Sequence, residues 1–281
     1  MTPRGRPPVA LTIAGSDPSG GAGIQADLKT FSALGAFGTS VITALTAQAT
    51  TGVTGVHEVP VDFVRLQLDT LLADVRLDAV KVGMLGSAAL AACVGEYLSG
   101  PLAGRYRVLD PVMVATSGSR LLADDAVDAV RAILPHADVI TPNLAEAAVL
   151  TDSAPATTVA QMREQARRLR VELGARAVLV KGGHLDDTGG MGDAVDLWLD
   201  ADGERLFRVP RVPTINSHGT GCTLSSALAA LRPRRADWPS TVVDAKAWLT
   251  EALRHADSLD IGAGPGPVHH FHEHIDRWDT P

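Results

Sequence analysis

Short apolar runs alternate along the chain with longer segments in which apolar side chains recur every three or four positions. The runs predict buried strands and the longer segments predict helices. Strands are expected at residues 9–14, 39–45, 79–82, 106–109, 139–141 and 177–180, and helices at 22–34, 62–72, 87–98, 124–134, 144–150, 159–173, 222–231 and 240–256. Alternation of this kind is typical of a parallel sheet covered by helices on both faces.

The C-terminal third departs from this alternation. Residues 196–199 and 206–209 flank Asp202-Gly203 and predict an antiparallel hairpin, because an Asp-Gly pair favours a tight turn. We find no internal repeat and no low-complexity linker. We therefore expect one domain over residues 9–281, preceded by a polar, disordered tail at residues 1–8.

Composition narrows the class of protein. Hydrophobic residues make up 46% of the 281 residues, which suits a globular α/β protein. The net charge of -7 argues against a nucleic-acid partner, whose phosphates need a basic surface. No apolar run has the length of a signal core or of a membrane span, so we expect a cytoplasmic protein that does not enter membranes. Two cysteines make no disulfide framework. Arginine outnumbers lysine 21 to 4, which we interpret as a bias of composition.

Several polar or small residues fall at the predicted strand ends. Ligands of open α/β sheets bind beyond the C-terminal ends of the strands. The residues in this position are Gly15, Gln48, Met84, Asp110, Asn143 and Lys181. We therefore expect them to share one site.

Residues 215–227 are the most informative stretch. Two glycines, Gly219 and Gly221, lead from a polar turn into a predicted helix. The amides of Gly219 to Cys222 are then unpaired at a helix N-terminus, where the dipole favours an anion. The alternative is an ordinary glycine-containing helix cap.

Seven further stretches agree with a known family. They are residues 14–30, 41–48, 81–85, 109–113, 141–147, 178–184 and 266–271. With 215–227 they make the chain similar to the hydroxymethylpyrimidine/phosphomethylpyrimidine kinases of thiamine biosynthesis, in the ribokinase-like superfamily. The resemblance implies a three-layer α/β/α sandwich with a mostly parallel central sheet and a small lid. It also implies a homodimer, the use of ATP and Mg²⁺, and two successive phosphorylations of an aminopyrimidine alcohol.

The resemblance assigns roles at the phosphate end of the site. The start of the helix at Gly219, Thr220, Gly221 and Cys222 would hold the charge of the transferred group. Lys181, Asn143 and Thr220 would contact the nucleotide, and Asp110 and Glu146 would lie on the magnesium side. Simpler alternatives remain: Lys181 as a surface lysine, Glu146 as a helix-dipole partner, and Asn143 as the N-cap.

At the substrate end the resemblance places the pyrimidine near Gly15, Ala22, Gln48 and Met84. A glutamine suits an aminopyrimidine because its amide both accepts and donates. Met84 offers a polarizable apolar surface, although it could be plain core. Asp27 is a second candidate, with a helix neighbour as its alternative partner.

Cys222 occupies a position where many ribokinase-like sugar kinases carry an aspartate base. We expect the helix N-terminus to lower its thiol pKa, so that a thiolate accepts the alcohol proton. In the second step the nucleophile is a phosphate, which a fixed carboxylate would repel and a neutral thiol would not.

Two segments carry weaker predictions. The polar loop at residues 115–120 is a candidate cover for the site, or else a plain connection. The C-terminal histidines, His269, His270, His272 and His274, are predicted to be structural rather than metal ligands.

Two rival functions remain at this stage. One is a pyridoxal kinase of the same fold, because both substrates carry a hydroxymethyl group on a six-membered aromatic ring. The other is a non-catalytic pyrimidine-binding sensor, which would have no use for Lys181, Asp110, Glu146 and the glycine-rich helix start.

Overall fold

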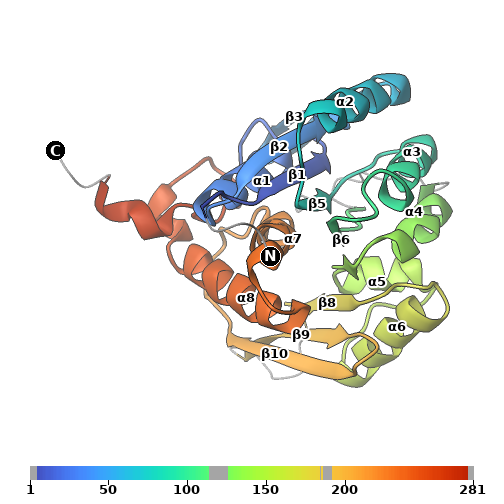
Figure 1. Ribbon diagram of the computed structural model, residues 1–281. Coiled ribbons are helices and arrows are strands. Elements are labelled where there is room, and N and C mark those ends of the chain that lie inside the picture. Colours follow the sequence, from blue (N-terminus) through green and yellow to red (C-terminus); the bar gives the residue numbers. More distant parts are fainter. Residues whose placement is uncertain (1–4, 114–125, 184, 186–191, 278–281) are drawn as a thin grey trace.

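An eight-stranded sheet runs through the middle of the protein (Figure 1). The computed structural model describes residues 5–113, 126–183, 185 and 192–277. The strand order is β10-β9-β8-β7-β6-β5-β1-β2, with parallel pairing from β8 to β2 and antiparallel pairing of β8, β9 and β10. The strands are β1 Val9–Ala14, β2 Phe37–Ile42, β5 Ala79–Val82, β6 Tyr106–Leu109, β7 Val139–Ile140, β8 Val178–Gly182, β9 Asp193–Leu199 and β10 Glu204–Pro210.

Helices cover both faces of this sheet. One face carries α2 Val61–Asp74, α3 Ala88–Ser99, α4 Val127–Ile133, α5 Leu144–Leu150 and α6 Val159–Val171. The other carries α1 Gly23–Ala33, α7 Thr220–Leu231 and α8 Trp238–Arg254. Short 3₁₀ segments occur at Leu134–His136, Arg232–Arg234, Ala256–Leu259 and His272–Arg277. The predicted α/β/α sandwich is confirmed.

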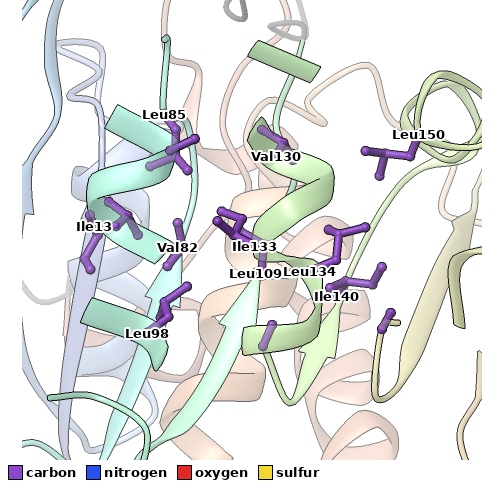
Figure 2. Packing of buried hydrophobic residues seen from close by; sticks show 14 of the residues in the cluster. Ile13, Val82, Leu85, Leu98, Leu109, Val130, Ile133, Leu134, Ile140 and Leu150 are labelled. Carbon is purple, nitrogen blue, oxygen red and sulfur yellow. The ribbon is translucent and has the colours of Figure 1, made fainter. Parts of the chain in front are cut away.

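The core divides into two clusters because side chains alternate across each strand. On β1, Leu11 and Ile13 pack toward α2–α6, whereas Ala10 packs toward α1, α7 and α8. Figure 2 shows the first cluster, in which Ile13, Val82, Leu109 and Ile140 from four neighbouring strands meet apolar side chains of α3 and α4. No helix within the described ranges has the length and apolar character needed to cross a bilayer.

The predicted strand 39–45 is two strands. The chain leaves the main sheet at Thr43, whose amide donates to the Ala14 carbonyl and whose hydroxyl donates to the Met84 carbonyl. Beyond it, β3 Ala44–Ala49 and β4 Gly52–Glu58 form a separate antiparallel sheet, which corresponds to the small lid. Gln48 lies in β3, so its expected place at the end of a strand of the main sheet is wrong.

The expected disordered tail does not extend to residues 5–8. Arg6 forms an ion pair with Asp78 at 3.1 Å, and the Pro8 carbonyl accepts from the Phe37 amide. These contacts attach the segment to the ends of β5 and β2. Residues 1–4 lie outside the described part of the chain.

Candidate active site

The site lies beyond the strand ends at the point where the order of successive strands in the sheet reverses. β1 pairs with β2 on one side and β5 on the other, and the helices that follow β1 and β5 cover opposite faces. Such a switch point leaves an open crevice beyond the strand ends. Gly15 follows β1 and Met84 follows β5, and a Cβ added at Gly15 would lie 3.4 Å from the Met84 sulfur. The structure therefore brings these two predicted residues together.

The first turn of α7 contacts this crevice from the other end of the chain. Gly219 is the N-cap, with φ 77, and its carbonyl accepts from the Thr223 amide at 2.8 Å. A Cβ added there would lie 1.7 Å from the Gly21 carbonyl oxygen. Both the positive φ and this close approach therefore require glycine at position 219. The amides of Gly221 and Cys222 have no intrahelical acceptor, as in the first turn of any helix.

Thr220 is held against the preceding turn. Its amide and its hydroxyl both donate to the Ser217 carbonyl, at 3.2 and 2.6 Å. Its contact with a nucleotide stays a prediction, and the hydroxyl oxygen would serve there as an acceptor or after rotation.

Lys181 and Asp110 meet in front of that turn. Lys181 Nζ lies 2.8 Å from Asp110 Oδ1, and a Cβ added at Gly221 would lie 3.0 Å from the same nitrogen. Burial favours a raised pKa for Asp110, but the ammonium groups of Lys181 and Lys81 outweigh it and hold the pKa below its ordinary value. Lys181 is thus no surface lysine: its charge and the free amides of α7 face one space.

Glu146 and Asn143 form a capping box at the start of α5. The Asn143 side chain accepts from the Glu146 amide at 2.9 Å, and the Glu146 carboxylate accepts from the Asn143 amide at 2.8 Å. Asn143 is therefore the N-cap, as one alternative predicted. Burial raises the pKa of Glu146 to about 7, against the opposing charge of Lys181.

The fit of a magnesium ion follows from these groups. Within the described residues no group of three His, Cys, Asp or Glu side chains is arranged to hold a metal. Asp110 and Glu146 act on each other electrostatically and share the neighbourhood of Lys181. Mg²⁺ bound with phosphates needs only one or two carboxylates and completes its shell with water, so this pair suffices in number. Both oxygens of Asp110 accept hydrogen bonds, from Lys181, Thr141 and Ser225, so Asp110 would contact the ion through its water shell or after exchange of one of these bonds.

Cys222 lies near the amide of Gly23, the first residue of α1, and this amide favours the ionised thiol. Two helix N-termini therefore meet at this thiol. The expected lowering of its pKa is nevertheless wrong, because burial raises the pKa to about 11 despite the nearby charge of Lys81. The thiol is neutral at pH 7 in the free protein.

Asp27 also departs from the prediction. It is fully buried, and its oxygens accept from Lys81 Nζ, Thr12 Oγ1 and Ser226 Oγ. A carboxylate with these partners presents no free oxygen to a substrate. The structure therefore removes Asp27 from the substrate contacts; its partners come from two strands and from α7, not from the neighbouring helix residue that was the alternative.

Comparison with known proteins agrees with this geometry. A family model described as phosphomethylpyrimidine kinase matches residues 17–269. The chain belongs to this family. The hydroxymethylpyrimidine/phosphomethylpyrimidine kinase of Escherichia coli K12 is 54% identical over 94% of this chain and 97% of its own length.

Two solved structures share the fold. The phosphomethylpyrimidine kinase of Clostridium difficile 630 is 38% identical, with a TM-score of 0.75, over 88% of this chain and 99% of that one. The pyridoxal kinase of Staphylococcus aureus, in complex with AMP-PCP and pyridoxal, is 32% identical, with a TM-score of 0.84, over 95% and 94%. Membership of a kinase family excludes the sensor alternative.

Sequence reasoning missed one pair in this kinase. His218 Nε2 lies 2.8 Å from Asp17 Oδ2 and 3.4 Å from Gln48 Nε2. If the imidazole nitrogen donates to Asp17 it cannot also accept from Gln48, and the shorter distance favours Asp17. The Gln48 amide, whose oxygen accepts from Thr46 Oγ1 at 3.3 Å, is therefore only weakly held. The pair Asp17 and His218 was detectable only as polar residues inside the two glycine-rich motifs.

The C-terminal segment supports the start of α7. The His218 amide donates to the Gly266 carbonyl, and His270 Nε2 lies 3.1 Å from the Thr223 hydroxyl. Burial lowers the pKa of His270 to about 3, and the rings of His255 and His272 stack. These packing contacts agree with the predicted structural role. The candidate cover at 115–120 lies outside the described residues.

Proposed function

We propose that this kinase transfers the γ-phosphate of ATP to 4-amino-5-hydroxymethyl-2-methylpyrimidine and then to the monophosphate product. The observation that carries the proposal is the meeting of Lys181, Asp110 and the free amides of α7 around Gly221. Phosphoryl transfer requires little covalent chemistry from the protein, and depends on positioning and on neutralisation of charge. A lysine and two amides directed at one space supply both.

The pyrimidine would bind at the switch point. Gln48 on the lid presents an amide whose oxygen accepts from the exocyclic amine and whose nitrogen donates to the adjacent ring nitrogen. Its long contacts with Thr46 and His218 exchange easily for these bonds. Met84 and Gly15 line the opposite side of the crevice, and Ala22 lies before α1, where Asp17 accepts from its amide.

The hydroxyl proton would pass to Cys222. Because the thiol is neutral in the free protein, the thiolate must form as substrate and nucleotide bind, and the nearby Gly23 amide favours that ionised form. In the second step the phosphate nucleophile is ionised near pH 7, and the neutral thiol serves without deprotonation.

ATP and Mg²⁺ belong to this proposal as cosubstrate and cofactor. Lys181 would contact the nucleotide phosphates. The side-chain NH₂ group of Asn143 remains available as a second donor, since only the side-chain oxygen of Asn143 is engaged in the cap. Asp110 and Glu146 would hold the ion, which supplies neutralisation of phosphate charge when bound.

Assembly and location are also proposals. We infer a cytoplasmic homodimer. Support for the dimer comes from exposed apolar side chains on the edge strand β2 and the adjoining α2, β3 and β4, namely Phe37, Leu45, Val56, Phe63 and Leu66. Sedimentation of the wild type and of Phe37→Asp tests it: the wild type should sediment as a dimer and the variant as a monomer.

Pyridoxal kinase activity is the second candidate, because the Staphylococcus aureus pyridoxal kinase shares the fold. ADP release decides between the two when the pyrimidine alcohol, its monophosphate and pyridoxal are supplied separately. We expect kcat/KM to be highest for the two pyrimidines. A higher kcat/KM for pyridoxal would overturn the proposal. Gly221→Val, which fills the space beside Lys181 Nζ, provides the inactive control.

A further inference from the structure

The four lysines of the chain are buried or partly buried. Each ammonium group lies against an oxygen atom: Lys29 on Gly20, Lys81 on Asp27, Lys181 on Asp110 and Lys246 on Asp196. Arginine supplies the described surface ion pairs, such as Arg167 with Glu164. An ammonium is a compact charge, whereas a guanidinium is a broad fork. Each of the four lysines therefore supplies a compact charge to its oxygen partner.

Lys81 is the most deeply buried of the four. Its Nζ lies 2.9 and 2.8 Å from the two oxygens of Asp27, and Thr12 and Ser226 each donate to this carboxylate at 2.6 Å. Lys81, Asp27, Thr12 and Ser226 all have 0% exposure. A buried ion pair is a poor source of stability, because desolvation offsets the attraction. Its presence calls for another explanation.

The position of this pair relative to Cys222 provides one. Asp27 on α1 accepts from Ser226 on α7, and Gly23 and Cys222 lie one turn earlier on the same two helices, where the Gly23 amide acts on the thiol. Residues four apart lie on the same face of a helix, one above the other. Lys81, on β5, contacts Asp27 beside Ser226. Its charge therefore lies about one helical turn from the Cys222 sulfur and the anion site, toward the interior of the protein.

We propose that Lys81 is a positioning residue for phosphoryl transfer, whose enclosed charge stabilises negative charge at the Cys222 sulfur and at the first turn of α7. The proposal rests on the function proposed for Cys222. The charges that act on the sulfur are the ammonium groups of Lys81 and Lys181 and the carboxylates of Asp27 and Asp110. Burial is the main cause of the raised Cys222 pKa, and Lys81 is the main group that opposes it.

Two substitutions separate an electrostatic role from a structural one. Lys81→Met and Asp27→Asn break the same ion pair, but they remove charges of opposite sign. The measurement is the rate at which iodoacetamide alkylates Cys222 at pH 8, with peptide mass spectrometry to distinguish it from Cys93. We expect about a tenfold decrease in Lys81→Met and an increase in Asp27→Asn, since an uncompensated charge at this range shifts ionisation by about tenfold. Changes in the same direction, or none, would overturn the proposal.

A neutral double variant covers the case in which the single variants do not fold. Lys81→Met with Asp27→Asn keeps the volume and removes both charges. Because the two charges act on the sulfur with opposite signs and that of Lys81 acts more strongly, we expect the alkylation rate and the kcat for the alcohol to fall, but by less than in Lys81→Met, with an unchanged KM; unchanged or raised values would overturn the proposal. The matched control is Arg107→Met with Asp138→Asn, a largely buried pair on the face of the sheet covered by α3, which should lose stability but keep kcat and alkylation rate.

Cys222→Ser distinguishes failure of this inference from failure of the base assignment. A serine variant with full kcat would refute the base role of Cys222. The alkylation rates of the other variants would still report whether Lys81 acts on the sulfur.

Discussion

The His218 imidazole lies 2.8 Å from the Asp17 carboxylate, and this contact joins two glycine-rich segments 201 residues apart in sequence. Asp17 also accepts from the Ser19 and Ala22 amides, so its two oxygens organise the loop that precedes α1. The carbonyl of Gly21 in this loop lies against Gly219. One carboxylate therefore sets the distance between the substrate side and the phosphate side of the site.

Asp17→Asn should lower stability at neutral pH. Burial opposes ionisation, but hydrogen bonds from His218, Ser19 and Ala22 outweigh it and lower the pKa to about 2. A lowered carboxyl pKa contributes stability above its unfolded value of 3.8, which is lost as pH falls toward 2. We expect a loss of about 2 kcal/mol at pH 7 that shrinks between pH 4 and pH 2. Urea unfolding at several pH values measures it, and a constant difference would contradict the account.

Lys181→Met should lower kcat by a factor on the order of 10²–10³ and change the KM for the pyrimidine little, since a preorganised charge contact is lost. It also leaves Asp110 buried and unpaired, so stability will fall. Arg107→Met controls for this effect, because it breaks a largely buried ion pair near the start of β6, whereas Asp110 follows the end of that strand. Single-turnover rates for both variants make the comparison. Equal kcat in wild type and Lys181→Met would remove Lys181 from the site.

Gln48→Glu should weaken pyrimidine binding by about 2–3 kcal/mol, the scale of a buried group left without its partner. The glutamate keeps an acceptor but loses the donor and adds a charge. ATP affinity should remain the same, because Gln48 lies on β3 of the lid and Lys181 on β8 of the main sheet. Calorimetric titration with each ligand tests both statements. Equal pyrimidine affinity in the two proteins would refute the assignment.

Cys222→Asp should separate the two half-reactions. A carboxylate can serve as base for the alcohol, but it repels the phosphate nucleophile of the second step at close range. The raised thiol pKa strengthens this expectation, since the wild-type side chain is neutral when the monophosphate binds. We expect the second phosphorylation to fall much further than the first when each is assayed alone. Equal losses, or a variant that prefers the monophosphate, would exclude this explanation for the cysteine.

Glu146→Gln should change how stability depends on pH. Burial raises the pKa of this carboxyl from 4.5 to about 7, so the folded protein holds an extra proton between these values. Wild-type stability should therefore decline relative to the variant as pH rises from 4.5 to 7, by up to about 3 kcal/mol. Glutamine preserves the acceptor of the capping box. Chemical unfolding across this range is the measurement, with Glu164→Gln on the surface of α6 as the control that should show no such decline.

The strand and helix pattern was largely predictable because a two-faced core imposes strong periodicity. β1, β5, β6 and α5 occur at the predicted residues. The strands of the lid were missed because they are largely exposed and because β3 is continuous in sequence with β2, so that one apolar run concealed a change of sheet at Thr43. Tertiary pairing, and not local propensity, ends the first strand there.

The site was predictable where residue type alone restricts the chemistry. Lys181, Asp110 and the glycines of the α7 start meet as expected. The errors concern electrostatic balance: the sequence shows that Cys222 begins a helix, but not that burial outweighs the dipole. It likewise shows an acidic residue at 27, but not that Lys81 and Ser226 occupy its oxygens. Such balances depend on partners far away in the chain.

The contact of Gly21 with Gly219 also bears on how the protein folds. The phosphate side of the site needs a loop from the first tenth of the chain and a helix start from its last quarter. Closing so long a loop is slow, because its entropy must be lost before any contact compensates for it. During synthesis the sheet from β1 to β8 can assemble while α7 is still unmade. The nascent chain therefore acquires a nearly complete scaffold before it has any means of holding a phosphate.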